Sequence, residues 1–312
     1  MSGDHRAFLS ALPADTRAAL CRTADGPALR RAAVHLGLIL ALGWTIAAGV
    51  PYWPLLLLPQ GVLIVFLFTA LHEAIHRTAF ATRWLNDALV WIAGAALLIG
   101  PDWFRAFHFA HHRHTQDPDH DPELAGGGKP DTWPAFLWHL TGLPVWWGSA
   151  RVLWRNATGA APEAFVPPRA LPRIRAEARS LLALYALLAA GSFAAGSGLL
   201  LWLWIVPALL GQPVLRLYLL AEHGRCPMVA DMFANSRTTF TTATVRWIAW
   251  NMPYHAEHHA FPAVPFHRLP ELHRLTRPHL KTTETGYARF AARYAAALPL
   301  EPEDGRQDAV SR

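Results

Sequence analysis

Two long stretches of the chain contain no charged residue, and they set the expected architecture. Residues 33–71 and residues 180–215 carry no Asp, Glu, Lys or Arg. Pro51-Tyr-Trp-Pro54 interrupts the first stretch and Gly196-Ser-Gly198 the second, which leaves four parts near the length that an α-helix needs to cross a bilayer. The pattern predicts two tight helical hairpins, with spans at about 33–50, 54–71, 180–196 and 199–221.

Shorter apolar segments lie between and after these spans. Residues 86–100 are apolar over too short a length to cross a membrane, so we expect a re-entrant or interfacial helix there. Residues 133–154 mix five tryptophans with polar groups, as in a segment at the headgroup level or in a packed cap helix. We expect three regions: a cytosolic N-terminal segment at 1–31, a membrane domain at 32–280, and a helix and polar tail at 281–312.

The positive charges predict the orientation of the spans. Neither hairpin turn carries Lys or Arg, whereas residues 1–31, 72–179 and 217–312 hold 5, 11 and 11 of the 28 basic residues. Because basic segments stay on the cytosolic side, all three polar regions are expected in the cytosol. The sole basic residue outside them is Arg216, near the end of the fourth span. A bacterial inner membrane is the expected location.

Composition supports this class of protein. The chain of 312 residues is 53% hydrophobic and contains 14 Trp. Two cysteines, Cys21 and Cys226, provide neither a disulfide framework nor a thiolate metal site. We therefore expect an all-α membrane protein, with four transmembrane helices in two hairpins and a cytosolic helical cap.

Three histidine clusters are the candidate chemistry of the chain. They are His72-Glu-Ala-Ile-His76, His108-Phe-Ala-His111-His112 and His255-Ala-Glu-His258-His259. Residues at i, i+3 and i+4 share one face of a helix, so each cluster directs its imidazoles to one side. With 17 histidines in the chain, chance would produce about 0.05 matches to H-x-x-H-H, and two are present. Isolated histidines such as His35 and His139 are expected to be ordinary packed residues.

Eight clustered imidazoles indicate a metal centre. Imidazole binds Zn, Cu, Fe and Ni, so the ligand type alone leaves the metal open. A single zinc uses three or four protein ligands, and eight histidines are about twice that number. The clusters therefore predict two metals, held where the cap meets the membrane.

The order of the three boxes over paired hairpins resembles the membrane fatty acid desaturase and hydroxylase superfamily, over about residues 35–280. His111-His-Arg-His-Thr-Gln-Asp-Pro118, Asp121-Pro-Glu123 and Asn251-Met-Pro-Tyr-His-Ala-Glu-His-His259 look most like the bacterial MocD-like branch. The resemblance implies two irons (Fe²⁺/Fe³⁺), O₂ activation and desaturation of an acyl chain of a fatty acid or lipid. A hydroxylase or ketolase acting on a lipid or carotenoid would use the same boxes.

The resemblance also implies a ninth ligand and external electrons. Family members use one more histidine between the second and third boxes, and His223 matches it; some relatives place an Asn one turn earlier, where this chain has Leu219. The implied metal ligands are His72, His76, His108, His111, His112, His223, His255, His258 and His259. The sequence has no haem attachment motif, Cys cluster or dinucleotide fingerprint. We therefore expect electrons from a separate ferredoxin, rubredoxin or cytochrome-type donor with its reductase. The expected substrate is a membrane lipid or acyl chain, and nucleic acid is not an expected partner.

Carboxylates near the boxes could orient the imidazoles, or they could be ordinary solvated acids on the surface. They are Glu73, Asp102, Asp117, Asp121, Glu222 and Glu257. We assign Glu73 an orienting role. The alternative is an intramembrane zinc metalloprotease, since His72-Glu73-Ala-Ile-His76 also fits H-E-x-x-H, but it leaves six box histidines unused. A metal transporter is a further alternative, although transport sites lie near the bilayer midplane.

Overall fold

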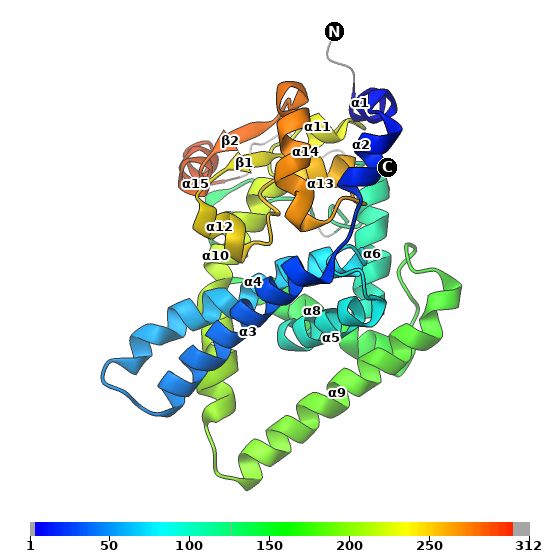
Figure 1. The fold of residues 1–312 in the computed structure, drawn as a ribbon. Helices are drawn as coiled ribbons and strands as arrows, with labels where there is room; N and C mark the ends of the chain where they lie inside the picture. Colours follow the sequence, from blue (N-terminus) through cyan, green and yellow to red (C-terminus); the bar gives the residue numbers. More distant parts are fainter. Residues whose placement is uncertain (1–3, 126, 302–312) are drawn as a thin grey trace.

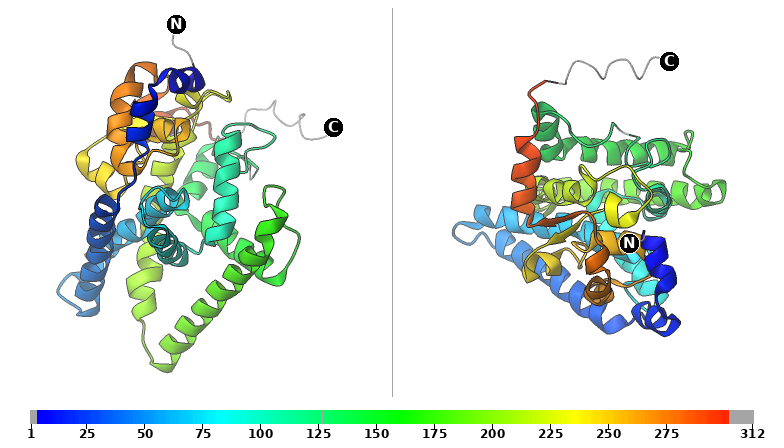
Figure 2. Two further views of the ribbon diagram at one scale, coloured as in Figure 1. Left: turned by 45° about the vertical axis from the view of Figure 1, so that its right-hand side comes forward. Right: turned by 90° about the horizontal axis from the view of Figure 1, so that it is seen from above.

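The computed structural model describes residues 4–125 and 127–301. Long helices form one half of the molecule, and short helices with a two-stranded sheet form a cap over their ends (Figure 1). The turns of the two long helical hairpins point away from the cap, as the left view of Figure 2 also shows. Chain segments far apart in the sequence therefore converge where the cap meets the helices.

The first hairpin is α3 (Asp25–Ala47) and α4 (Leu57–Ile75), joined through a 3₁₀ turn (Trp53–Leu56). The prolines break the helix as the sequence predicts, and Tyr52 takes a left-handed conformation at the turn (φ 63°). α4 is the central helix and packs on α3, α5 and α10. It ends at the first histidine box.

The second hairpin is α9 (Leu171–Ala194) and α10 (Val206–His223), with a π-helical turn (Leu201–Ile205) leading into α10. The turn falls at Gly196 (φ 56°), as predicted. The prediction of a tight pair is wrong, because α9 diverges from α10 and packs on α8 (Leu143–Thr158) and α6 (Pro101–His114) (Figure 1). The reason lies in the polar start of α9: Glu177 accepts hydrogen bonds from the backbone N–H groups of Asp102 (2.6 Å) and Trp103 (2.8 Å), which attaches α9 to the first turn of α6.

The backbones of α4 and α10 touch where two glycines face each other. A Cβ at Gly61 would lie 1.9 Å from the carbonyl oxygen of Pro207, and one at Gly211 would lie 2.4 Å from that of Gly61. Only glycine permits this approach. The contact lies near the start of both helices and holds α4, which carries His72, against α10, which ends at His223.

Three helices of the described residues are long and apolar enough to cross a membrane. They are Ala14–Ala47, Trp53–Ile75 and Leu201–His223. A fourth candidate arises if α5 (Arg83–Leu97) and α6 count as one broken span or re-entrant loop, with a bend of 96°. Three of the four predicted spans therefore have a matching helix. α9, at the place of the third predicted span, is not among these helices, because its charge-free part begins only at Ser180. The apolar helices still identify a membrane protein, and the bent α5–α6 pair agrees with the interfacial helix expected before residue 100.

The remaining elements form the cap and its flank. The cap contains α1 (His5–Ala11), α2 (Ala14–Leu20), α11 (Met232–Asn235), α12 (Ala243–Ile248), α13 (His255–Ala260), α14 (Leu269–Thr276) and α15 (Tyr287–Ala296). α7 (Trp133–Thr141) and α8 carry the exposed Trp138, Trp147 and Trp154. Short 3₁₀ turns lie at Pro168–Ala170, Phe266–Arg268 and Arg277–His279. The predicted polar tail from residue 302 lies outside the described residues.

The cap also contains two strands, so the prediction of an all-α fold needs correction. β1 (Thr238–Phe240) pairs in parallel with β2 (Thr283–Thr285), with Thr238 opposite Thr283. Both strands have only three residues, and their pairing depends on chain segments far apart in the sequence. Hydrophobic periodicity cannot reveal such a pair, because it registers only local repeats.

Candidate metal centre

All nine predicted histidines meet at one place, at the ends of four helices. α4 supplies His72 and leads directly to His76; α6 supplies His108, His111 and His112; α10 ends at His223; and α13 supplies His255, His258 and His259. Seven of the nine are buried, and His76 and His112 are half-buried. The rings lie in two adjacent groups, which we call the first and the second group.

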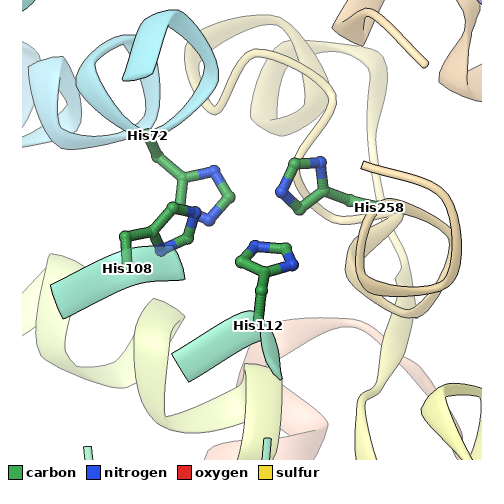
Figure 3. A group of neighbouring side chains, drawn as sticks. All are labelled: His72, His108, His112 and His258. Carbon is green, nitrogen blue, oxygen red and sulfur yellow. The ribbon is translucent and has the colours of Figure 1, made fainter. Parts of the chain in front are cut away.

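The first group contains His72, His76, His108, His112 and His258. Donor nitrogens of four of them, all but His76, lie within 4.8 Å of one another. Figure 3 shows these four rings directed toward one another from three segments of chain. His76 joins them, because its Nε2 lies 2.8 Å from Nε2 of His108 and its ring centroid lies 4.8 Å from that of His258.

The second group contains His111, His223, His255 and His259. Nε2 of His223 lies 3.2 Å from Nε2 of His111 and 2.9 Å from Nε2 of His255. His259 completes the group, since its donor nitrogen lies within 4.8 Å of those of His111 and His223. The two groups touch, because the rings of His112 and His259 stack with centroids 4.1 Å apart.

These distances fit metal ligation. Two nitrogens bonded to one ion at about 2.1 Å and at right angles lie about 3 Å apart, close to the observed Nε2 separations. Within residues 4–125 and 127–301, several buried imidazole nitrogens have no hydrogen-bond partner: His72 Nδ1, His259 Nε2 and both nitrogens of His112 and His258. Buried polar atoms are normally paired, so unpaired nitrogens facing one another are the expected state of metal ligands.

The protonation state of the third box also suits a metal. Burial, followed by the charges of neighbouring imidazoles, holds the pKa of His255, His258 and His259 well below its usual range. These rings are therefore neutral at pH 7. Neutral imidazole is the form that binds a metal ion.

Hydrogen bonds on the far side of the second group fix which nitrogen faces inward. Nδ1 of His111 bonds Asp121 (2.9 Å), and Nδ1 of His223 donates to the backbone carbonyl of Asn235 (3.1 Å). The Thr115 hydroxyl donates to the carbonyl of His111 (2.7 Å), so it accepts from Nδ1 of His259 (3.1 Å). Each ring thereby keeps Nε2 free, as in metal sites where an outer partner sets the tautomer. The sequence indicated Asp121 but not Thr115 or Asn235, because the last two act through contacts that only the fold creates.

The other candidate carboxylates take different places. Glu222 lies 3.4 Å from Nδ1 of His255. Asp102 lies beside Arg173, and Asp117 lies beside His120. Only Asp121 and Glu222, of the six candidates, therefore contact a box imidazole within the described residues.

Glu73 does not have the predicted orienting role. Its carboxylate accepts hydrogen bonds from the Thr78 hydroxyl (2.7 Å) and from the backbone N–H of Phe266 (3.0 Å). Glu73 lies on α4 between His72 and His76, and its side chain points away from their rings toward the segment that follows the third box. It joins α4 to the cap instead.

Glu257 likewise anchors its helix instead of touching a box histidine. It is fully buried and bonds the Thr238 hydroxyl and Nδ1 of His273. α13 has only six residues, too few to be stable alone. Its attachment through Glu257 to β1 and α14 holds three box histidines in place.

Two apolar cavities lie among the long helices. One of about 440 Å³ is lined by Leu98, just after α5, and by residues of α8, α9, α10 and the π-helical turn. The other, of about 310 Å³, is lined by residues of α3, α4, α5, α9 and the same turn. Tyr185, Leu188 and Trp204 line both. The Tyr185 hydroxyl and the Trp204 indole N–H donate to the carbonyls of Ala95 and Ala96, so their polar atoms are satisfied by α5 and the cavity walls remain apolar.

These features define the class of the protein: a helical membrane protein with a polyhistidine centre at its cap. The chain belongs to the fatty acid desaturase family, whose model matches residues 47–291. It is 26% identical to the dihydrorhizobitoxine desaturase of Bradyrhizobium elkanii over 276 residues, which cover 81% of this chain and 75% of that protein. A segment of 52 residues is 44% identical to a sphingolipid delta(4)-desaturase of Drosophila melanogaster, covering 16% of each chain.

Proposed function

We propose that this protein is a membrane di-iron oxidoreductase that uses O₂ and external electrons to desaturate an acyl chain of a fatty acid or lipid. The observation that carries the proposal is the meeting of nine buried or half-buried histidines in two adjacent groups of five and four. Membership of the fatty acid desaturase family supports the reaction class.

The histidines divide between the two metals in this proposal. His72, His76, His108, His112 and His258 would hold one ion, and His111, His223, His255 and His259 the other. Two adjacent all-nitrogen sites exceed what one catalytic zinc uses, which favours iron over a zinc protease. The place of Glu73, bonded to Thr78 and Phe266, gives no support to a general base in H-E-x-x-H.

When bound, the iron pair supplies activation of O₂ and removal of hydrogen from unactivated C–H bonds. The third box would present neutral imidazoles to both ions, and the hydrogen bond to Asp121 keeps His111 in one tautomer. The second group would supply four protein nitrogens, one fewer than the first group. Electrons come from a separate ferredoxin, rubredoxin or cytochrome-type donor.

The two apolar cavities among the long helices support an acyl substrate. Their walls are apolar and would accept a hydrocarbon chain. The relatives are named for unlike substrates, dihydrorhizobitoxine and a sphingolipid, so we keep the substrate class at acyl chains. Hydroxylation or ketone formation remains the alternative product on this scaffold.

We further propose that the cap and both ends of the chain are cytosolic, in a bacterial inner membrane. The histidine boxes lie where the cap meets the long helices, and neither hairpin turn contains a charged residue. A reporter enzyme fused after Arg312 should indicate a cytosolic location. A periplasmic signal there would reject this orientation.

The deciding experiment is expression with a matched ferredoxin and reductase, followed by mass spectrometry of the lipids. A product two mass units lighter than its precursor is expected, whereas a gain of sixteen units would identify a hydroxylase. Elemental analysis of the purified protein should give about two irons per chain. One zinc and no iron after growth in iron-rich medium would reject the proposal.

A further inference from the structure

A third cluster of metal-binding side chains lies outside the nine histidines. His114, the last residue of α6, is followed by a turn that contains Asp117 and His120. One donor atom from each of these three side chains lies within 4.8 Å of the other two. We call this set the surface triad, and it has no part in the proposed reaction.

The side chains of the surface triad converge on one carboxylate. Oδ2 of Asp117 lies 2.9 Å from Nδ1 of His120 and 4.0 Å from Nδ1 of His114. The two imidazole rings lie side by side, with centroids 5.3 Å apart. The other oxygen of Asp117 accepts from the backbone N–H of Asp119 (3.0 Å), which fixes the carboxylate in the turn. Small rotations of the exposed rings would therefore bring three donors onto one ion.

The triad is accessible, unlike the buried groups. The side chains of His114, Asp117 and His120 are exposed to 33, 38 and 63%. An ion held there would complete its coordination with water. Two imidazoles and one carboxylate suit a divalent first-row transition ion and do not suit Ca²⁺ or Mg²⁺, which prefer oxygen ligands.

The same turn supports the second group from its inner side. Thr115 bonds His259, Asp121 bonds His111, and the Gln116 amide donates to the carbonyl of His223 (3.0 Å). Thr115, Gln116 and Asp121 are buried, whereas the stretch from 118 to 120 is exposed. One short segment thus contacts the rings of His111 and His259 and the backbone of His223 on one side, and presents the surface triad on the other.

From this arrangement we propose that His114, Asp117 and His120 form a peripheral binding site for a divalent transition metal ion such as Zn²⁺. A bound ion would tie the last residue of α6 to the turn and so restrain the segment that bonds the rings of His111 and His259 and the backbone of His223. Because such coupling is reciprocal, an occupied surface triad should raise the affinity of the second group for its metal. The site does not depend on which reaction the buried centre performs.

The test is zinc binding by the iron-loaded full-length protein in detergent, after removal of any affinity tag. Equilibrium dialysis against Zn²⁺, followed by elemental analysis, should show about one saturable zinc more in the wild type than in His114→Ala or His120→Ala, with iron unchanged in all three. His279→Ala is the control. His279 packs on Phe8, far from the surface triad in the sequence, so this variant should keep the extra zinc. Because iron is counted in every sample, loss of the buried centre would be seen separately.

Co²⁺ provides an independent readout of the ligands. Cobalt bound by the wild type should give visible absorption that changes in both variants, as expected when an imidazole is lost from its coordination. Equal zinc binding by wild type and both variants, or no saturable zinc in the wild type, would overturn the proposal. Either result would mean that the triad is a solvated hydrogen-bonded turn only.

Discussion

The two histidine groups are held in place by different interactions. In the second group, His111, His223 and His259 each use Nδ1 in a hydrogen bond to a defined partner. These partners come from the segment after α6 and from Asn235, the last residue of α11. Polar contacts therefore fix the position and the tautomer of three of the four second-group rings.

The first group is positioned mainly by packing. The ring of His108 stacks on Phe104 (5.4 Å, 12°), His76 lies against Phe109 (5.3 Å), and His72 lies near Phe68 (6.3 Å). Among the described residues, Nδ1 of His72 and both nitrogens of His112 and His258 have no hydrogen-bond partner. Removing polar neighbours should consequently affect the second group far more than the first.

The largest expected effect follows from removing a second-group ligand. His223→Ala should lower iron from about two to about one per chain and reduce turnover by more than about 100-fold, beyond the range for an outer hydrogen-bond partner. The chain should still insert, since His223 stands at the cap end of α10. Iron analysis and product formation measure both effects.

His139→Ala is the matched control for that variant. His139 lies on α7, outside both groups, and should keep iron and turnover. Full iron and activity in His223→Ala would mean that the second group works with three histidines, and that His223 is an ordinary packed residue.

Separating α4 from α10 should disturb both groups together. In Gly61→Ala the new Cβ would collide with the carbonyl of Pro207, so the helices must move apart at a cost of about 1–3 kcal/mol. We expect a lower melting temperature in detergent and loss of iron from both groups. Gly191→Ala on α9 is the control, because nothing lies within 4 Å of its Cβ position. A melting temperature equal to that of the control would show that the close contact is not needed.

The sequence predicts which histidines meet better than it predicts the contacts that support them. Box spacing identifies eight histidines because i, i+3 and i+4 positions share a helix face, and the resemblance adds His223. The hairpin turns at Tyr52 and Gly196 follow from local prolines and glycines. In contrast, the divergence of α9 follows from Glu177 reaching the start of α6, and the β1–β2 pair joins distant segments. Asn235 contributes a backbone carbonyl, which no residue pattern encodes.

Asp121 contacts a second-group imidazole, whereas Glu73 lies between two first-group histidines on α4 without bonding either ring, so changing each carboxylate tests the comparison. Asp121→Asn removes the charge that faces His111, and losses of roughly 10–100-fold in metal affinity or activity are expected. Glu73→Gln should cost much less, because an amide oxygen can still accept from Thr78 and from the N–H of Phe266. Turnover and iron retention against a chelator measure both.

Equal losses in the two variants would contradict the difference between the groups. Asp119→Asn, in the exposed part of the same turn, controls for changing a nearby charge. Peptidase activity in the wild type that disappears in Glu73→Gln would instead favour the metalloprotease alternative.

The smallest expected effect comes from a neutral hydrogen bond to the second group. Thr115→Val keeps the shape of the side chain but removes the oxygen that accepts from His259. A neutral hydrogen bond contributes about 1 kcal/mol, so the second iron should dissociate about five times faster, with little change in the first. Thr158→Val is the matched control, since Thr158 makes the same bond to the carbonyl four residues earlier, on α8. Stopped-flow chelation gives the two rates separately; equal acceleration of both phases would show that Thr115 supports the whole centre and not His259 alone.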